Sequence, residues 1–273
     1  MSKKVKISVV PFGGLGNRMR VLNSAFYLSK DINAETTLVW LKKAELNADF
    51  FRIFEHASFD FKLLRGFRYK VFLKFVKHIY INQYPKLYRF ILGIFFDKIL
   101  FDSDVQSLSS ETLIEQISSS KSVLIATCYE FYPFSGFDNF KLNKELEAKI
   151  TSFQIPEGSI GVHIRRTDHV DIIKESSLDN YHVEMRKCIA ENQNVKFYLA
   201  TDDAVVKAEF LNIYKSRIIT QDAPLNRDSE AGIFGGIVDI YNLARCYKII
   251  CNVKSSFAVT AKLIGKEKEL INV

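Results

Sequence analysis

Two adjacent arginines follow an apolar strand in the segment 161–168, Gly-Val-His-Ile-Arg-Arg-Thr-Asp. A guanidinium group is costly to bury without a partner, and its planar fork matches the geometry of phosphate oxygens. Arg165 and Arg166 are therefore candidate phosphate-binding groups, and Asp168 could orient one of them. An arginine–Asp168 ion pair that only closes the strand explains the same spacing equally well.

A second polar group follows the apolar run 197–200, where Thr201, Asp202 and Asp203 stand in sequence. Carboxylates at the end of a strand could accept hydrogen bonds from a base or a ribose. Thr and Asp are also common N-cap residues of helices, and capping of the helix that follows is the favoured interpretation of this block taken alone.

The start of the last predicted helix is a candidate anion site, because Ser255 and Ser256 follow Lys254 there. Free backbone amides, two hydroxyls and the helix dipole would together attract a phosphate. A serine N-cap explains the same residues, and the two roles are compatible.

Asp239 is an acid within the apolar helical pattern 236–243. A buried carboxylate without a partner is costly, so the pattern predicts either an internal hydrogen-bond donor, which is favoured, or a ligand.

The glycine-rich segment 13–18, Gly-Gly-Leu-Gly-Asn-Arg, has neither the spacing of a dinucleotide fingerprint nor the Lys-Ser/Thr ending of a P-loop. Its glycines would still let a ligand approach the backbone.

The elements that must position these residues alternate between strands and helices. Strands are predicted at 5–10, 37–40, 123–127, 159–164, 196–199, 217–220, 248–251 and 269–273, and helices at 17–29, 142–152, 178–191, 204–214, 230–244 and 257–264. This order predicts parallel sheets covered by helices on both faces, with ligands beyond the carboxyl ends of the strands. Pro156 and Gly158 lie between a helix and a new strand, so we expect an N-terminal domain at 1–154 and a C-terminal domain at 155–273.

The charge of the chain is concentrated in one segment. The 273 residues carry a formal net charge of +7, and residues 64–101 hold eight basic residues, one acid and eleven aromatic residues. We expect this basic aromatic insert to form one or two helices broken at Tyr84-Pro85. Two interpretations remain open: a solvated helical pair with a Phe/Tyr core, or a face that meets an anionic membrane surface. Nucleic-acid binding is disfavoured, because the rest of the chain is neutral.

Cysteine spacing and hydropathy favour a cytoplasmic location. The four cysteines form no CxxC pair and no Cys/His ligand cluster, which argues against a zinc site or a disulfide framework. The N-terminal apolar run is too short for a signal peptide, and no stretch reaches the roughly 18 apolar residues of a spanning helix. We therefore expect a cytoplasmic location, peripheral on the inner membrane face if the insert binds lipid.

Four blocks in one order carry a family resemblance: Gly-Gly-Leu-Gly-Asn at 13–17, His-x-Arg-Arg-x-Asp at 163–168, Tyr-Leu-Ala-Thr-Asp-Asp at 198–203 and Ser-Ser-Phe at 255–257. Together they resemble the GDP-fucose-dependent fucosyltransferases, which include the α1,2-, α1,6- and protein O-fucosyltransferases. The resemblance covers both ends of the chain and nearly all of the second half. It implies an α/β fold of GT-B type, with two Rossmann-like domains facing across a cleft and the donor held mainly by the second.

The resemblance also implies roles for individual residues. Arg165 would contact the diphosphate of GDP-fucose, and Asn17 would reach the fucose, so these two are the predicted catalytic residues. The predicted donor-binding residues are Gly14, Gly16, His163, Arg165, Arg166, Asp168, Tyr181, Asp202, Asp203, Asp239, Ser255, Ser256 and Phe257. Among these, His163 and Asp239 would lie at the guanine.

The implied reaction is a metal-independent, cofactor-free transfer of L-fucose with inversion, giving an α-linked product on a glycan or lipid-linked acceptor of surface polysaccharide or lipopolysaccharide. Neither the residues nor the resemblance identifies a general base. Arg18 and Arg20 depart from the α1,2 pattern, and His169 stands where the α1,6 branch commonly has Lys, so the linkage stays open. A non-catalytic nucleotide-sugar-binding module, or a transferase of another GDP-sugar, is the alternative.

Overall fold

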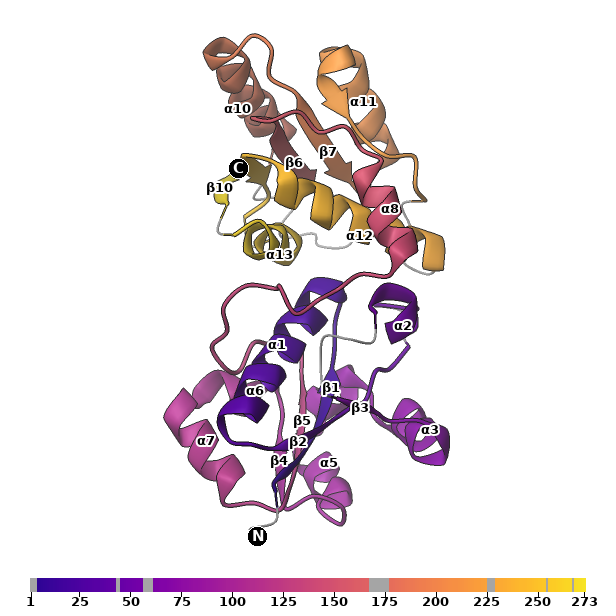
Figure 1. Ribbon diagram of the computed structural model, residues 1–273, viewed down its shortest axis with the longest axis vertical. Helices are drawn as coiled ribbons and strands as arrows, with labels where there is room; N and C mark the ends of the chain where they lie inside the picture. Colours follow the sequence, from indigo (N-terminus) through magenta and orange to yellow (C-terminus); the bar gives the residue numbers. More distant parts are fainter. Residues whose placement is uncertain are drawn as a thin grey trace. The chain divides into compact units, whose positions relative to one another are not determined.

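The computed structural model describes residues 4–42, 45–55, 61–166, 177–224, 229–253, 255–266 and 268–273 (Figure 1). The chain forms two compact units, Met1–Lys141 and Leu142–Val273. Each unit contains one five-stranded sheet in which all described strand pairs are parallel. The α/β class and the parallel sheets predicted from the alternating pattern are confirmed.

The sheet of the first unit has the order β3-β2-β1-β5-β4. Its strands are β1 (Lys6–Pro11), β2 (Glu35–Leu38), β3 (Lys62–Leu63), β4 (Lys98–Leu100) and β5 (Ser122–Thr127), and helices α1 (Leu15–Asp31), α2 (Phe50–Ile53), α6 (Asp102–Ser107) and α7 (Ser110–Ser118) accompany them. The central strands are apolar on both faces, since Val9 and Val10 of β1 and Leu124 and Ile125 of β5 are fully buried. Such continuous apolar runs are typical of parallel strands covered on both sides.

The basic aromatic insert forms three helices, α3 (Gly66–Phe75), α4 (His78–Gln83) and α5 (Pro85–Leu92). The predicted break at Tyr84-Pro85 is confirmed. A further break follows Phe75, because Val76 leaves the helix and enters the core. The prediction of one or two helices is therefore wrong, because the segment has three and ends in β4, which pairs with β5 and adds a strand to the sheet.

The sheet of the second unit has the order β10-β9-β6-β7-β8. Its strands are β6 (Ile160–Ile164), β7 (Phe197–Thr201), β8 (Ile218–Ile219), β9 (Lys248–Cys251) and β10 (Glu269–Asn272), with helices α8 (Lys144–Thr151), α10 (Leu178–Glu191), α11 (Ala204–Tyr214), α12 (Glu230–Arg245) and α13 (Ser256–Ile264) and the short 3₁₀ turn η1 (Lys215–Arg217). Residues of α10 and α11 pack in one core cluster with β6 and β7. Helix α12 approaches β6 so closely that a Cβ at Gly161 would lie 2.8 Å from Leu243 Cδ2.

Helix α8 belongs to the second unit, so the units divide between Lys141 and Leu142 and not after residue 154 as the sequence suggested. The reason is its contact with α12. The guanidinium of Arg245 donates to the carbonyls of Ile150 and Phe153 at 2.8 and 3.1 Å. The Pro156–Gly158 turn therefore lies within the second unit and starts β6. Among the described residues, no helix is both long and apolar enough to span a membrane.

Candidate functional site

The second unit contains a pocket at the carboxyl ends of its strands. Its walls come from the ends of β6 and β7, the segment 220–224 after β8, and helices α11, α12 and α13. The lining residues are His163, Arg165, Leu199, Ala200, Thr201, Asp202, Lys207, Thr220, Gln221, Ala223, Pro224, Gly232, Gly235, Gly236, Asp239 and Phe257. This is the edge at which parallel sheets bind ligands, and five predicted site residues meet there.

His163 lies near the end of β6 and is nearly buried, at 6% exposure. Its Nδ1 is 3.1 Å from Ser255 Oγ, and the ring of Phe257 stacks on it with centroids 4.5 Å apart. The hydroxyl of Ser255 also accepts a 3.2 Å hydrogen bond from the backbone amide of Ala258, which caps α13. The predicted N-cap is confirmed, and the same serine holds the imidazole against the helix start.

The backbone of the two arginines is held by side chains at neighbouring strand ends. The amide of Arg165 donates to Asn252 Oδ1 and that of Arg166 to Asp202 Oδ1, both at 2.8 Å. Arg165 lines the pocket, whereas Arg166 is not among the lining residues. Asn252, directly after β9, is 1% exposed, and its Nδ2 has no partner within the described part of the chain.

Asp239 lines the pocket from α12, and its internal donor is Tyr198 on β7. The phenol donates a 2.8 Å hydrogen bond to Asp239 Oδ1. Burial raises the pKa of this carboxyl to about 7, although hydrogen bonds from Tyr198 and Gln221 favour the ionised form. The predicted internal partner of Asp239 is confirmed, and the group changes charge near neutral pH.

The structure places other predicted residues away from the pocket wall. Asp203 caps α11 by accepting from the amides of Val205 and Val206 at 2.8 and 3.2 Å, which confirms the favoured interpretation. Tyr181 is fully buried in the core and donates a 3.1 Å hydrogen bond to the carbonyl of His163. Ser256 is the first residue of α13. Asp168, Lys254 and His169 lie outside the described residues.

The glycine-rich segment lies in the first unit, between β1 and α1. Gly13 has a φ of +79°, and a Cβ there would lie 2.6 Å from Asn17 Nδ2, so the turn requires glycine. Gly14 caps α1, and Gly16 lies in its first turn. The carboxamide oxygen of Asn17 accepts a 2.7 Å hydrogen bond from Arg20.

Arg18, which departs from the α1,2 pattern, has a structural role in this loop. It is fully buried, donates to the carbonyls of Gly13 and Leu41 at 2.8 Å each, and lies over the ring of Trp40. Burial lowers its pKa to about 10, against the influence of Glu45 and Tyr69. Arg18 therefore holds the glycine turn against the segment that follows β2.

Several pocket residues were not predicted from the sequence. Lys207 pairs with Asp222 at 3.0 Å, and the Gln221 amide donates to the carbonyl of Gly235 at 2.6 Å. Gln221 could have been identified as a polar residue that follows a short strand. Asn252, which follows β9, could have been identified in the same way. Lys207 gave no signal, because it lies on an ordinary helix. Tyr198 belongs to the block 198–203 that carries the resemblance, but its place within an apolar strand did not indicate its contact with Asp239.

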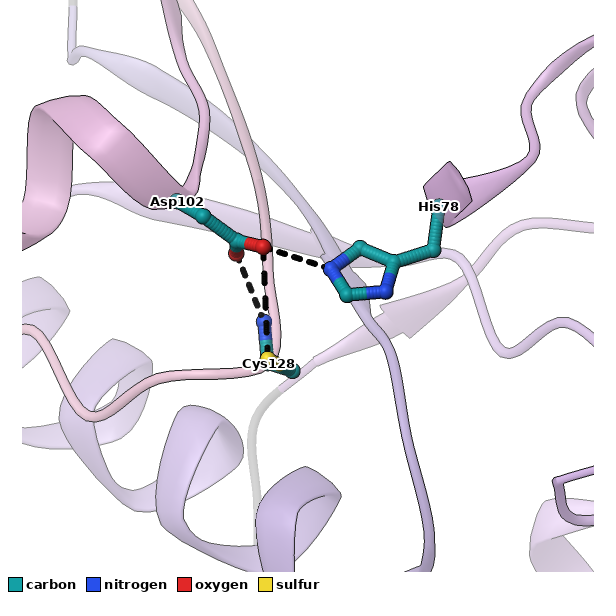
Figure 2. Close-up of side chains that lie close together, drawn as sticks. All are labelled: His78, Asp102 and Cys128. Atoms are coloured by element: carbon teal, nitrogen blue, oxygen red, sulfur yellow. Dashed lines mark hydrogen bonds and ion pairs between the residues drawn. The ribbon is translucent and has the colours of Figure 1, made fainter. Parts of the chain in front are cut away.

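A second group of chemistry-bearing side chains lies in the first unit, where His78, Asp102 and Cys128 converge (Figure 2). Asp102 Oδ2 is 2.6 Å from His78 Nε2 and accepts from Asn82 at 2.8 Å. Asp102 Oδ1 accepts from Thr127 Oγ1 at 2.7 Å and from the amide of Cys128 at 3.1 Å. Because donors occupy both carboxylate oxygens, the geometry is that of a hydrogen-bonded charge pair more than of a cation site.

The pKa of His78 is raised and the pKa of Asp102 is lowered by their interaction. Burial alone would lower the pKa of His78, but hydrogen bonds to Asp102 and Cys128 outweigh it and raise the value to about 9. Burial alone would raise the pKa of Asp102, but hydrogen bonds from His78, Thr127 and Asn82 lower it to about 2. Both groups are therefore charged at neutral pH.

Comparison with known families bears on the second unit. Residues 138–261 match the family model described as alpha-(1,6)-fucosyltransferase N- and catalytic domains. This span contains every residue of the pocket wall, including His163, Arg165 and Asp239. The predicted resemblance to the fucosyltransferases is confirmed. A search of curated proteins finds no match.

Solved fucosyltransferase structures share the fold over nearly the whole chain. The α-1,6-fucosyltransferase NodZ soaked with GDP-fucose is 20% identical, with a TM-score of 0.63 over 96% of this chain and 93% of that one. A point mutant of Arabidopsis thaliana FUT1 in complex with GDP is 12% identical, with a TM-score of 0.62 over 96% of this chain and 69% of that one. POFUT1 in complex with GDP is 10% identical, with a TM-score of 0.54 over 100% and 98%. The chain therefore has the GT-B-type fold of these fucosyltransferases.

Proposed function

We propose that this protein transfers L-fucose from GDP-fucose to a glycan acceptor, with inversion at the anomeric carbon and an α-linked product. The observation that carries the proposal is the pocket of the second unit, where residues of separate predicted blocks, His163, Arg165, Asp202, Asp239 and Phe257, share one wall. The fold and the family match of this segment support the same assignment.

The base-binding end of the site is assigned to Asp239 and His163. An ionised carboxylate is an acceptor only, and guanine presents two neighbouring N–H donors on one edge, whereas uracil and adenine do not. Tyr198 occupies Asp239 Oδ1 with one hydrogen bond, which leaves acceptor capacity on the carboxylate for a ligand. The stack of His163 on Phe257 gives this part of the pocket a rigid aromatic wall.

The diphosphate end is assigned to Arg165 and the start of α13. As GDP leaves, negative charge develops on the β-phosphate while the sugar gains oxocarbenium character. A guanidinium on a backbone position that is held in place and the free amides of a helix start stabilise that charge without reorganising. The hydrogen bonds from Arg165 N to Asn252 and from Arg166 N to Asp202 support this preorganisation, because they hold the backbone of both arginines before the ligand arrives.

The remaining assignments rest on the resemblance. Asn17, Gly14 and Gly16 are proposed to serve the sugar, and Arg166, Asp168, Tyr181 and Asp203 to support the donor loop and its strands. The reaction is proposed to need no cofactor, and the acceptor to be an oligosaccharide or a lipid-linked glycan of surface polysaccharide or lipopolysaccharide synthesis in the cytoplasm.

The experiment that tests the proposal measures GDP released from GDP-fucose, with and without lipid-linked oligosaccharide as acceptor. A transferase releases GDP slowly alone and faster with acceptor. A nucleotide-sugar-binding module, the second candidate, binds GDP-fucose and releases nothing under either condition. GDP-mannose in a parallel reaction distinguishes a transferase of another sugar, and turnover of GDP-mannose in place of GDP-fucose would contradict the assignment of fucose.

A further inference from the structure

The helical segment of the first unit carries an unusual density of exposed apolar side chains. Among the described residues, eleven of the seventeen exposed large hydrophobic residues fall between 67 and 95. They are Phe67, Val71, Phe75, Ile79, Tyr80, Tyr84, Leu87, Phe90, Ile91, Ile94 and Phe95, and we call this set the outer face. Five of them, Phe67, Ile79, Phe90, Ile94 and Phe95, are 69 to 82% exposed. Apolar side chains gathered in this way mark an interaction site, whereas single ones need no explanation.

The outer face follows from helical periodicity. Phe67, Val71 and Phe75 are spaced by four residues along α3, so they share one side of that helix. Leu87, Phe90 and Ile91 have i, i+3 and i+4 spacing in α5 and likewise share a side. The other sides of these helices pack on the core cluster that contains Val10, Val39 and Leu124, through Tyr69, Phe72, Leu73, Tyr88 and Leu92. Helices α3 and α5 are thus apolar on two sides, and the core covers only one of these sides.

Polar contacts fix the covered side in place. Arg89 of α5 binds Asp104 of α6 at 2.6 Å, and His78 of α4 binds Asp102 of the same helix at 2.6 Å. The phenol of Tyr88 donates to the carbonyl of Phe75 at 2.9 Å and so joins α5 to α3. With these contacts made, turning the outer face inward would break two ion pairs, so its exposure is a property of the folded unit.

The segment that carries the outer face has a large excess of positive charge. Arg65, Arg68, Lys70, Lys74, Lys77 and Lys86 are exposed in the same segment. Two of these lysines lie beside outer-face rings, Lys74 over Phe75 and Lys77 over Tyr80. The one acid between 64 and 101, Asp97, is directed to the backbone, where it accepts from the amides of Lys121 and Ser122 at 2.9 Å. The carboxylate is thus held at the start of β5, and it offsets only one of the eight basic charges of the segment.

We propose that the outer face docks on the surface of an anionic lipid bilayer, with its phenylalanine and isoleucine side chains in the interface and the surrounding lysines and arginines at the headgroups. Apolar insertion combined with basic flanks is the chemistry of interfacial helices. A second copy of the chain fits less well, because the same face would bring two sets of positive charge together. The inference rests on this surface alone and not on the donor pocket.

The test is co-sedimentation of the full chain with vesicles of phosphatidylcholine, alone or mixed with phosphatidylglycerol. We expect sedimentation with the anionic vesicles at low salt, release as salt is raised, and weak binding to phosphatidylcholine alone. Lys70→Glu combined with Lys74→Glu should weaken binding by more than about tenfold, since each basic residue near the surface contributes measurably.

The apolar part is tested with Phe90→Ser combined with Ile94→Ser. This variant should lose vesicle binding while its circular dichroism stays unchanged, because neither side chain packs on the core. Its matched control is Val205→Ser with Ile213→Ser, two residues of α11 that are 77% and 52% exposed outside the outer face. The control should bind as the wild type does.

Three results would overturn the proposal. The first is wild-type protein that stays in the supernatant with anionic vesicles at low salt. The second is equal vesicle binding by the wild type and by both sets of outer-face variants. The third is a concentration-dependent dimer, abolished by Phe90→Ser with Ile94→Ser, in protein that binds no vesicles, which would assign the face to a second copy. Vesicle binding by protein that does not bind GDP-fucose would leave this proposal standing and contradict only the proposed function.

Discussion

The phenol of Tyr198 donates a 2.8 Å hydrogen bond to Oδ1 of Asp239 and so connects the buried strand β7 to a carboxylate of the pocket wall. Asn242, on the same helix as Asp239, donates a 3.2 Å hydrogen bond to the phenol oxygen. Burial raises the pKa of Asp239 to about 7. Asp239, a side chain of the proposed guanine site, is therefore oriented by the buried Tyr198 and changes charge near neutral pH.

GDP affinity should follow the charge of Asp239. Below about pH 7 the carboxyl is protonated and loses acceptor capacity for the guanine N–H groups, so GDP should bind more weakly at pH 6 than at pH 8. Asp239→Asn should weaken binding about 10- to 100-fold at pH 8, as loss of a charged hydrogen-bond acceptor does, and should remove the pH dependence. Isothermal titration calorimetry with GDP measures both effects.

The control for this measurement is Asp222→Asn, which removes a fully exposed carboxylate that pairs with Lys207 of the same pocket. It should retain the pH dependence of the wild type. Equal GDP affinity of Asp239→Asn and the wild type at pH 8 would remove Asp239 from the guanine site.

The same substitution should stabilise the second unit in the absence of nucleotide. The pKa of Asp239 rises from an ordinary 3.8 to about 7 on folding, so the folded state binds more protons between these values. Wild-type stability should therefore fall as the pH rises from about 4 to 7. Asparagine can still accept from Tyr198 but cannot ionise, so the variant should be the more stable protein at pH 8, by a margin that shrinks toward pH 4. Hydrogen exchange of peptides that cover β7 reports this, and a margin independent of pH would contradict it.

Arg165→Ala should abolish most turnover and leave the fold intact. Arg165 lines the pocket after β6, while the backbone at this position is held through its amide, which alanine keeps. Loss of one fixed donor to a developing anion lowers kcat about 100- to 1000-fold in comparable sites. The measurement is GDP released from GDP-fucose, with Arg186→Ala on the exposed side of α10 as the control. Undiminished turnover in Arg165→Ala would refute its assigned role.

The pair of His78 and Asp102 should stabilise the first unit over a defined pH range. The pKa of His78 rises from 6.5 to about 9, so its contribution is complete below 6.5 and disappears as the pH rises through 9. The pKa of Asp102 falls from 3.8 to about 2, so its contribution is present above 3.8 and disappears as the pH falls through 2. The free-energy difference between wild type and His78→Gln should be largest between about pH 4 and 6.5.

The stability of the first unit can be measured through Trp40, which is the single tryptophan of the chain. Trp40 lies in the first unit and is 3% exposed. Urea unfolding followed by its fluorescence reports the first unit alone. A difference that stays constant from pH 5 to pH 9 would show that the pair is not charged as the geometry indicates.

The second unit could be predicted from the sequence in some detail. Helices 178–191 and 204–214 and strand 248–251 are found at the predicted bounds, because continuous apolar runs and cap residues such as Asp203 act locally. The pocket residues at strand ends, His163, Arg165 and Asp202, could be identified for the same reason. Polar side chains that directly follow buried parallel strands lie at the carboxyl edge of the sheet, where ligands bind.

The first unit was harder, for physical reasons. Strands β3 and β4 have two and three residues and form only because β2 and β5 offer free edges, which no local pattern reveals. The pair of His78 and Asp102 joins residues 24 positions apart through the fold. The position of α8 depends on contacts of Arg245 with Ile150 and Phe153, so the unit boundary could not be found from turn residues alone.

The central claim is that the pocket of the second unit binds GDP-fucose, and thermal-shift measurements with GDP-fucose, GDP, ADP and UDP test it most directly. A ligand that binds only the folded state raises the melting temperature by mass action. We predict an increase with GDP-fucose and GDP, little change with ADP and UDP, and loss of the increase in Asp239→Asn. Equal increases with all four nucleotides, or none with GDP-fucose, would contradict the account.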